Sequence, residues 1–150
     1  MAISAELETM IARNCDDVFA RLADVRRYPE WLVASAIVSA EVAGDGPIAA
    51  GSKLRIAQQI AGRASTLEGT VTAFEPGSRL AFRAKDPEGV SIEIDARLSP
   101  EGATCRLRWA VKLGLPLKYR FFESMLAPQV RQAAVADLER LRTGLQSVAG

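Results

Sequence analysis

Two polar residues interrupt otherwise apolar patterns, and they are the side chains best placed to do chemistry. Gln58 lies between Ile56 and Ile60 on the apolar face of a predicted strand. A buried amide without partners costs about 1–3 kcal/mol, so Gln58 either orients a polar group of a ligand, makes a structural hydrogen bond, or meets water at a cavity mouth. Asp137 lies on the apolar face of a predicted helix. It is either a ligand contact or base with a raised pKa, an ion-pair partner of an arginine, or rotated into solvent.

Catalytic motifs are missing from the sequence. The chain has no histidine, which excludes His-based triads, His-ligated metals and the usual proton shuttle at neutral pH. No nucleophile, phosphate-binding, zinc-binding or dinucleotide-binding signature is present. Cys15 and Cys105 lack the spacing of a metal site. We expect both to stay reduced, with Cys105 as a small buried hydrophobe, and we expect no metal and no cofactor.

Length and composition are those of one ordinary domain. The chain has 150 residues, 49% hydrophobic and 25% charged, and we treat residues 1–150 as a single domain. A formal net charge of +1 argues against a nucleic-acid surface. Residues 1–13 lack the continuous apolar core of a signal peptide, and no stretch reaches the ~18–20 apolar residues of a membrane span. We expect a cytoplasmic monomer or homodimer.

Alternation of apolar and polar residues dominates the middle of the chain and predicts seven strands joined mostly by tight turns. Between the first two strands, Asn14 is a predicted helix N-cap and begins the first of two short helices, which end near residues 23 and 31. Short turns between strands indicate an antiparallel sheet with one solvated face. The predicted strands cover residues 3–11, 36–42, 53–60, 66–73, 79–85, 90–98 and 103–113.

A long amphipathic helix is predicted over residues 124–148. At ~1.5 Å per residue it would be roughly 37 Å long, enough to cross a small domain. It is the only predicted element long enough to cover the apolar face of the sheet, so the fold class is α+β. Its apolar positions recur at three- and four-residue steps: Leu126, Val130, Ala133, Ala134, Leu138, Leu141, Leu145 and Val148.

Small residues occur at several positions predicted to face inward. On facing surfaces they either allow close packing or leave a void, and the pattern alone fits both. These residues are Ala5, Ala73, Ala84, Ala96, Ala103, Ala133 and Ala134.

Two segments carry a resemblance to a known family. Residues 17–31, which end in Tyr28-Pro29-Glu30-Trp31, and residues 71–80, with Phe74 two positions before Pro76, resemble segments of the polyketide cyclase/dehydrase branch of the START/Bet v 1-like (SRPBCC) superfamily. The resemblance covers the whole chain. It implies the helix-grip fold, in which a curved seven-stranded antiparallel sheet grips the C-terminal helix and leaves an apolar cavity between them.

The cavity implied by this resemblance gives further candidate residues. We expect Leu67, Phe82, Ile92 and Trp109 to line it, although aromatic residues at such positions also serve as core. Gln129 borders the helix stripe near the expected entrance. The aromatic and apolar residues before and at the helix start either form a mobile entrance or plug the end of the core: Tyr28, Tyr119, Phe121, Phe122 and Met125.

Three classes of function remain open. The first is binding of a small, largely hydrophobic ligand, such as a lipid, a polyketide or another aromatic or isoprenoid metabolite. The second, implied by the resemblance, is a polyketide cyclase/dehydrase-type enzyme that acts mainly by holding a reactive chain in one conformation. The third is a protein-interaction module resembling a chaperone partner, which predicts a filled core and an exposed apolar patch.

Overall fold

A single curved sheet forms most of the molecule. The computed structural model describes residues 2–44, 46–60 and 63–147. Seven strands form one sheet in the order β1-β7-β6-β5-β4-β3-β2, and every neighbouring pair is antiparallel. The strands are β1 (Ala2–Ile11), β2 (Ile37–Val42), β3 (Lys53–Ile60), β4 (Arg63–Glu75), β5 (Arg79–Lys85), β6 (Ser91–Glu101) and β7 (Thr104–Gly114).

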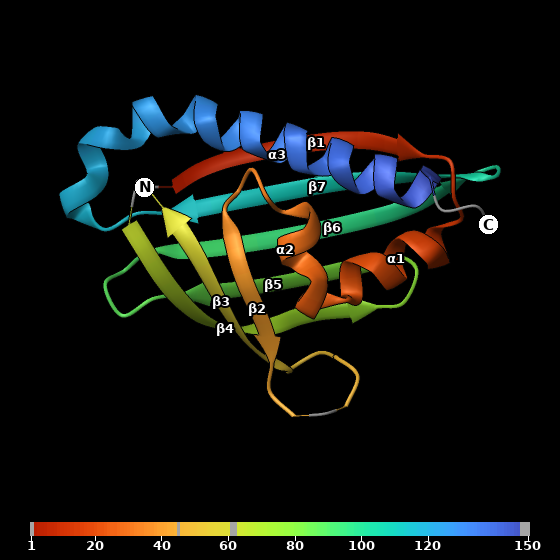
Figure 1. The fold of residues 1–150 in the computed structure, drawn as a ribbon, viewed down its shortest axis with the longest axis horizontal. Coiled ribbons are helices and arrows are strands. Elements are labelled where there is room, and N and C mark those ends of the chain that lie inside the picture. The colour runs from red at the N-terminus through yellow and green to blue at the C-terminus, as the bar shows by residue number, and fades with distance from the viewer. Residues whose placement is uncertain (1, 45, 61–62, 148–150) are drawn as a thin grey trace.

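Helices cover one face of this sheet. Two of them, α1 (Cys15–Ala23) and α2 (Tyr28–Trp31), follow β1 and flank the short 3-10 turn η1 (Val25–Arg27). The chain ends with a second 3-10 segment, η2 (Leu117–Phe122), and the long helix α3 (Glu123–Ser147). Figure 1 shows α3 running beside β1, while α1 and α2 lie on the same side of the sheet. The sheet and helices therefore form the two-layer helix-grip fold.

The predicted elements agree closely with the observed ones. All seven strands and both short helices are present, and α3 begins one residue before its predicted start. Val148, the predicted last residue of that helix, lies outside the described residues. The expectation for Ala103 is wrong: it is exposed in the turn between β6 and β7, because β7 begins only at Thr104.

The two halves of α3 are packed differently. In the second half, Leu138, Leu141 and Leu145 are buried against the sheet. In the first half, Leu126 and Val130 are only partly buried and Met125 is exposed. The first half of α3 thus lies over a less densely filled part of the interior.

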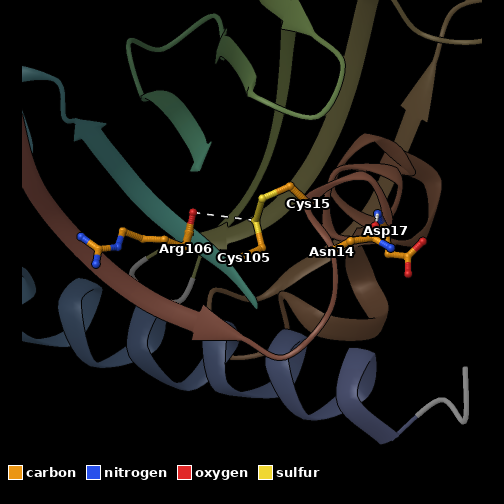
Figure 2. Close-up of a disulfide and its surroundings, with 5 residues drawn as sticks. All are labelled: Asn14, Cys15, Asp17, Cys105 and Arg106. Atoms are coloured by element: carbon orange, nitrogen blue, oxygen red, sulfur yellow. Dashed lines mark hydrogen bonds between the residues drawn. A yellow bond between two sulfur atoms is a disulfide. The ribbon is translucent and has the colours of Figure 1, made fainter. Parts of the chain in front are cut away.

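A disulfide joins the first residue of α1 to β7, and Figure 2 shows its surroundings. Cys15 and Cys105 are bonded to each other across 90 positions of sequence, so the expectation that both stay reduced is wrong. The spacing of the two cysteines in the sequence does not predict this bond. It forms because the pairing of β1 with β7 brings the start of β7 beside the end of β1. The helix start is also fixed by Asn14, whose Oδ1 accepts the backbone N–H of Asp17 at 2.8 Å, as predicted.

Removing this crosslink tests its contribution. We expect Cys15→Ser/Cys105→Ser to lower the free energy of unfolding by about 2–4 kcal/mol, because closing a loop of this length restricts the unfolded chain. Urea denaturation of the double variant and of the oxidised wild type measures the difference. Equal midpoints and slopes for the two proteins would show that the bond adds nothing to stability.

Candidate ligand-binding cavity

A cavity of about 170 Å³ lies under the first half of α3. Its walls come from the loop between α2 and β2, from strands β2, β3, β5, β6 and β7, and from α3. Most of its lining is apolar: Leu32, Ala34, Ser35, Ala36, Ile37, Gln58, Gln59, Phe82, Ile92, Ile94, Trp109, Val111, Leu113, Leu126, Gln129, Val130, Ala133 and Ala134. A dry cavity of ~150 Å³ takes up benzene, so this one has room for a molecule of at least one ring.

Two aromatic residues of the cavity wall pack against aromatic residues of the core. Phe82 on β5 stacks on Tyr28, with ring centroids 6.0 Å apart, and Trp109 on β7 meets Trp31 edge to face at 5.5 Å. The Tyr28 hydroxyl donates a hydrogen bond to the Leu22 carbonyl at 2.6 Å. Tyr28 therefore belongs to the core and not to the predicted entrance. Such packing fixes the rotamers of Phe82 and Trp109 and gives the wall a defined shape.

The loop between α2 and β2 is held in place by the buried carboxylate of Asp137. Oδ1 accepts the backbone N–H of Ala34 at 2.7 Å and Oδ2 accepts that of Ser35 at 3.0 Å. Arg140, one turn further along α3, lies 3.5 Å from Oδ1. Only 1% of Asp137 is exposed, and burial raises the pKa of its carboxyl above the ordinary value, against the opposing effect of these hydrogen bonds.

Gln58 holds the same loop from the opposite side. Its Nε2 donates to the Ser35 carbonyl at 2.8 Å. Ala36, the next residue, has a left-handed φ of 57°, which costs a non-glycine residue roughly 1–2 kcal/mol. The hydrogen bonds from α3 and β3 offset this cost and keep the loop in the cavity wall.

Charged side chains are missing from the described lining. Its polar side chains are Ser35 and three glutamines, Gln58, Gln59 and Gln129. Gln59 and Gln129 are exposed, whereas Gln58 is buried. Among the described lining residues, Gln58 is thus the one polar residue that is buried, and none of them is charged.

The structure divides the predicted site residues into two groups. Gln58, Phe82, Ile92, Trp109 and Gln129 line the cavity. The others lie elsewhere: Leu67 is fully buried, Asp137 is bound to the loop, and Phe122 and Met125 are exposed near the start of α3. Which of them touch a ligand stays a prediction.

Sequence reasoning missed the loop at positions 34–36 as part of the wall. Its residues are small and show no periodicity. Its position depends on a carboxylate more than 100 positions away, since Ala34 and Asp137 are separated by 103 residues. A buried acidic residue on an apolar helix face was the only available signal, and it did not identify the partner.

The part of the chain that the structure describes contains no helix with the length and apolar composition of a membrane span. Within the same residues, no group of three or more metal-ligating side chains comes together.

Substitution of Asp137 tests the carboxylate that holds the loop. We expect Asp137→Asn to lower the free energy of unfolding by about 1–3 kcal/mol at neutral pH, because an asparagine has one acceptor oxygen and leaves one backbone N–H unpaired. Arg140→Gln, which removes only the longer contact, is the matched control and should cost less. Urea denaturation gives both values, and an unchanged Asp137→Asn midpoint would contradict this role.

The pH dependence of the same variant has a defined sign. With its pKa raised in the folded protein, Asp137 keeps its proton to higher pH there than in the unfolded chain, where the ordinary value is 3.8. The contribution of Asp137 to the free energy of unfolding is therefore fully present below pH 3.8. It declines as pH rises through the pKa of Asp137 in the folded protein. We expect the stability difference between wild type and Asp137→Asn to shrink as pH rises above 3.8 and through the raised pKa of the folded protein. A difference that grows over this range would contradict the raised pKa.

Comparisons with known proteins identify the family. The family model described as "Polyketide cyclase / dehydrase and lipid transport" matches residues 2–146. A comparison with curated proteins found no match.

Solved structures with the same fold come from several bacteria. The Zhui aromatase/cyclase from Streptomyces sp. R1128 is 18% identical, with a TM-score of 0.78 over 97% of this chain and 94% of that one. The protein TTHA0849 from Thermus thermophilus is 14% identical, with a TM-score of 0.78 over 98% and 99%. A START superfamily protein from Mycobacterium smegmatis is 17% identical, with a TM-score of 0.66 over 95% and 94%. At these identities the structures show a shared fold, and the match to the family model shows that the chain belongs to the polyketide cyclase/dehydrase and lipid transport family.

Proposed function

We propose that this protein binds a small, largely hydrophobic ligand, such as a lipid, a polyketide or another aromatic or isoprenoid metabolite, in the cavity under α3. The observation that carries the proposal is an apolar cavity of about 170 Å³ walled by both the sheet and the helix. Its wall is supported by aromatic packing and by hydrogen bonds from Asp137 and Gln58. A wall held in this way has little conformational entropy to lose when a ligand enters.

Burial of apolar surface supplies the driving force for this binding. Each Å² of apolar ligand surface removed from water contributes ~25 cal/mol before the costs of association. The open rim, where Gln59 and Gln129 are exposed, gives the ligand a path in that does not require unfolding of the core. No cofactor or metal takes part in this proposal.

A second candidate is catalysis of the polyketide cyclase/dehydrase type. It is favoured by the family description and by the fold shared with an aromatase/cyclase. The described lining contains no acidic or basic side chain, so the part of such a reaction that these residues explain is confinement of a flexible chain in one conformation. The test is a comparison of cyclised products from a poly-β-keto thioester with and without the protein. An unchanged product distribution would remove this candidate.

An exposed apolar segment favours the third class, a protein-interaction module. Leu117, Phe121 and Phe122 of η2 and Met125 of α3 are exposed, with Phe121 90% exposed. That class also predicts a filled core, however, and the interior contains a cavity. Ligand binding is therefore the better supported function.

The cellular compartment and the assembly state remain predictions. The sequence predicts a cytoplasmic monomer or homodimer without nucleic-acid partners, whereas a disulfide such as Cys15–Cys105 is typical of oxidising compartments. Alkylation of free thiols at lysis, followed by intact mass measurement, tests the compartment. Two alkylated cysteines in freshly lysed cells would support the cytoplasm, and none would favour an oxidising compartment.

Filling the cavity tests the proposed function. Ala133→Phe places a ring at the cavity wall, and we expect it to weaken binding of the single-ring probe para-ethyltoluene at least tenfold while the fold is kept. Ala136→Phe, on the exposed side of α3, is the matched control and should bind like the wild type. Titration followed by ¹H–¹⁵N NMR gives the dissociation constants. Equal binding by all three proteins would show that the probe binds outside this cavity.

A further inference from the structure

We propose that this protein docks onto the surface of a membrane that contains anionic lipids, through an exposed apolar segment around the start of α3. This docking segment consists of residues 117–125, which form η2 and the first residues of α3. Docking goes beyond the proposed function, because it requires no ligand in the cavity.

Large hydrophobic side chains that reach solvent are concentrated in this segment. Eight such residues occur in the described part of the chain, and four of them fall within these nine positions. In Figure 1 the chain between β7 and α3 projects at the end of the molecule farthest from α1. Single exposed apolar residues are ordinary, whereas a group of them in one segment marks an interaction surface. The four are Leu117 at 73%, Phe121 at 90%, Phe122 at 46% and Met125 at 56% exposed.

Positive charge is interleaved with these apolar residues. Lys118 directly follows Leu117, and its exposed side chain has no ion-pair partner among the described residues. Its Nζ lies 5.3 Å from the centre of the Tyr119 ring. Arg120 is the second basic residue of the segment, and Glu123 is its one acidic residue. Exposed apolar side chains with a net positive charge are the composition of segments that lie in the interface of an anionic membrane.

The same composition favours a membrane over a protein as the partner. Lysine is depleted at protein–protein interfaces relative to the rest of the surface. At a bilayer, the stem of Lys118 lies along the acyl boundary while its ammonium group stays among the headgroups. Phe121 is 90% exposed, so its ring enters the acyl boundary without movement of the fold. Both residue types therefore gain at a bilayer surface.

The docking segment is continuous with the cavity wall. Leu126 directly follows Met125 and lines the cavity, as do Gln129 and Val130 further along α3. Gln129 is exposed at the open rim. Apolar molecules partition from water into a bilayer, so docking at this segment brings the rim close to a store of apolar ligand. That consequence rests on the proposed function, whereas the docking itself does not.

Flotation with lipid vesicles tests the docking on the wild-type protein. The vesicles contain either phosphatidylcholine alone or a two-to-one mixture of phosphatidylcholine and phosphatidylglycerol. We expect the protein to bind the mixed vesicles about 5- to 25-fold more tightly, since each of two basic residues near an anionic surface contributes about a factor of five. High salt should reduce this preference, because it screens charges at the surface.

Three variants locate the contact. Phe121→Ser removes the most exposed ring and should weaken binding to the mixed vesicles at least about tenfold. Lys118→Gln should weaken it about fivefold and leave binding to phosphatidylcholine unchanged. Val135→Ser is the matched control and should bind like the wild type. It also replaces an exposed apolar residue of α3, 52% exposed, but at about 15 Å along the helix from Met125.

A fluorescent variant measures insertion without loss of the aromatic ring. Trp31 and Trp109 are buried, so their emission should not respond to vesicles. Phe121→Trp adds an exposed fluorophore to the docking segment. We expect its emission to shift to shorter wavelength with the mixed vesicles and to be quenched by brominated phosphatidylcholine, while the wild type shows neither change.

The outcomes separate docking from cavity binding. Absence of vesicle binding, or equal binding by wild type and Phe121→Ser, overturns the docking. A wild-type dimer that Phe121→Ser converts to a monomer in sedimentation velocity, without vesicle binding, also overturns it and assigns the segment to self-association. Each of these results leaves binding of para-ethyltoluene in the cavity untouched. Conversely, vesicle binding without binding of that probe supports docking and counts against the proposed function alone.

Discussion

The cavity depends on one short series of hydrogen bonds that connects α3 to the sheet. The carboxylate of Asp137 on α3 accepts the backbone N–H groups of Ala34 and Ser35, and the Ser35 carbonyl accepts Nε2 of Gln58 on β3. A buried carboxylate is costly unless donors surround it, and the backbone N–H groups of Ala34 and Ser35 supply such donors. The series fixes the loop that forms part of the cavity wall.

The two halves of α3 differ in how tightly they pack against the sheet, and this difference leaves space for the cavity. The second half packs against the sheet through Leu138, Leu141 and Leu145. The disulfide between Cys15 and Cys105 links α1 to β7. The first half presents Leu126, Val130 and the alanines at 133 and 134 to the cavity. Small side chains on this half leave volume in the cavity, which Trp109 also lines, that neighbouring residues do not fill. The second half of α3 thus packs against the sheet, whereas the first half lines the cavity.

Much of the fold could be read from the sequence because its signals are local. Alternation along Leu80, Phe82 and Ala84, and the three- and four-residue steps of the last helix, report which face is buried without knowledge of distant contacts. The void near Ala133 and Ala134 could be suspected but not located, since small residues allow close packing as well. The disulfide and the partners of Asp137 join residues about 90 to 100 positions apart. Such pairs are determined by the assembled sheet and leave no pattern in a single chain.

Native mass spectrometry of the protein purified from its own host, followed by extraction and identification of what is bound, tests the central claim most directly. We expect a stoichiometric, largely apolar compound that is lost in Ala133→Phe. An apo mass from the host, together with no thermal shift across neutral lipids, quinones and aromatic polyketides, would contradict the claim that this cavity is a binding site.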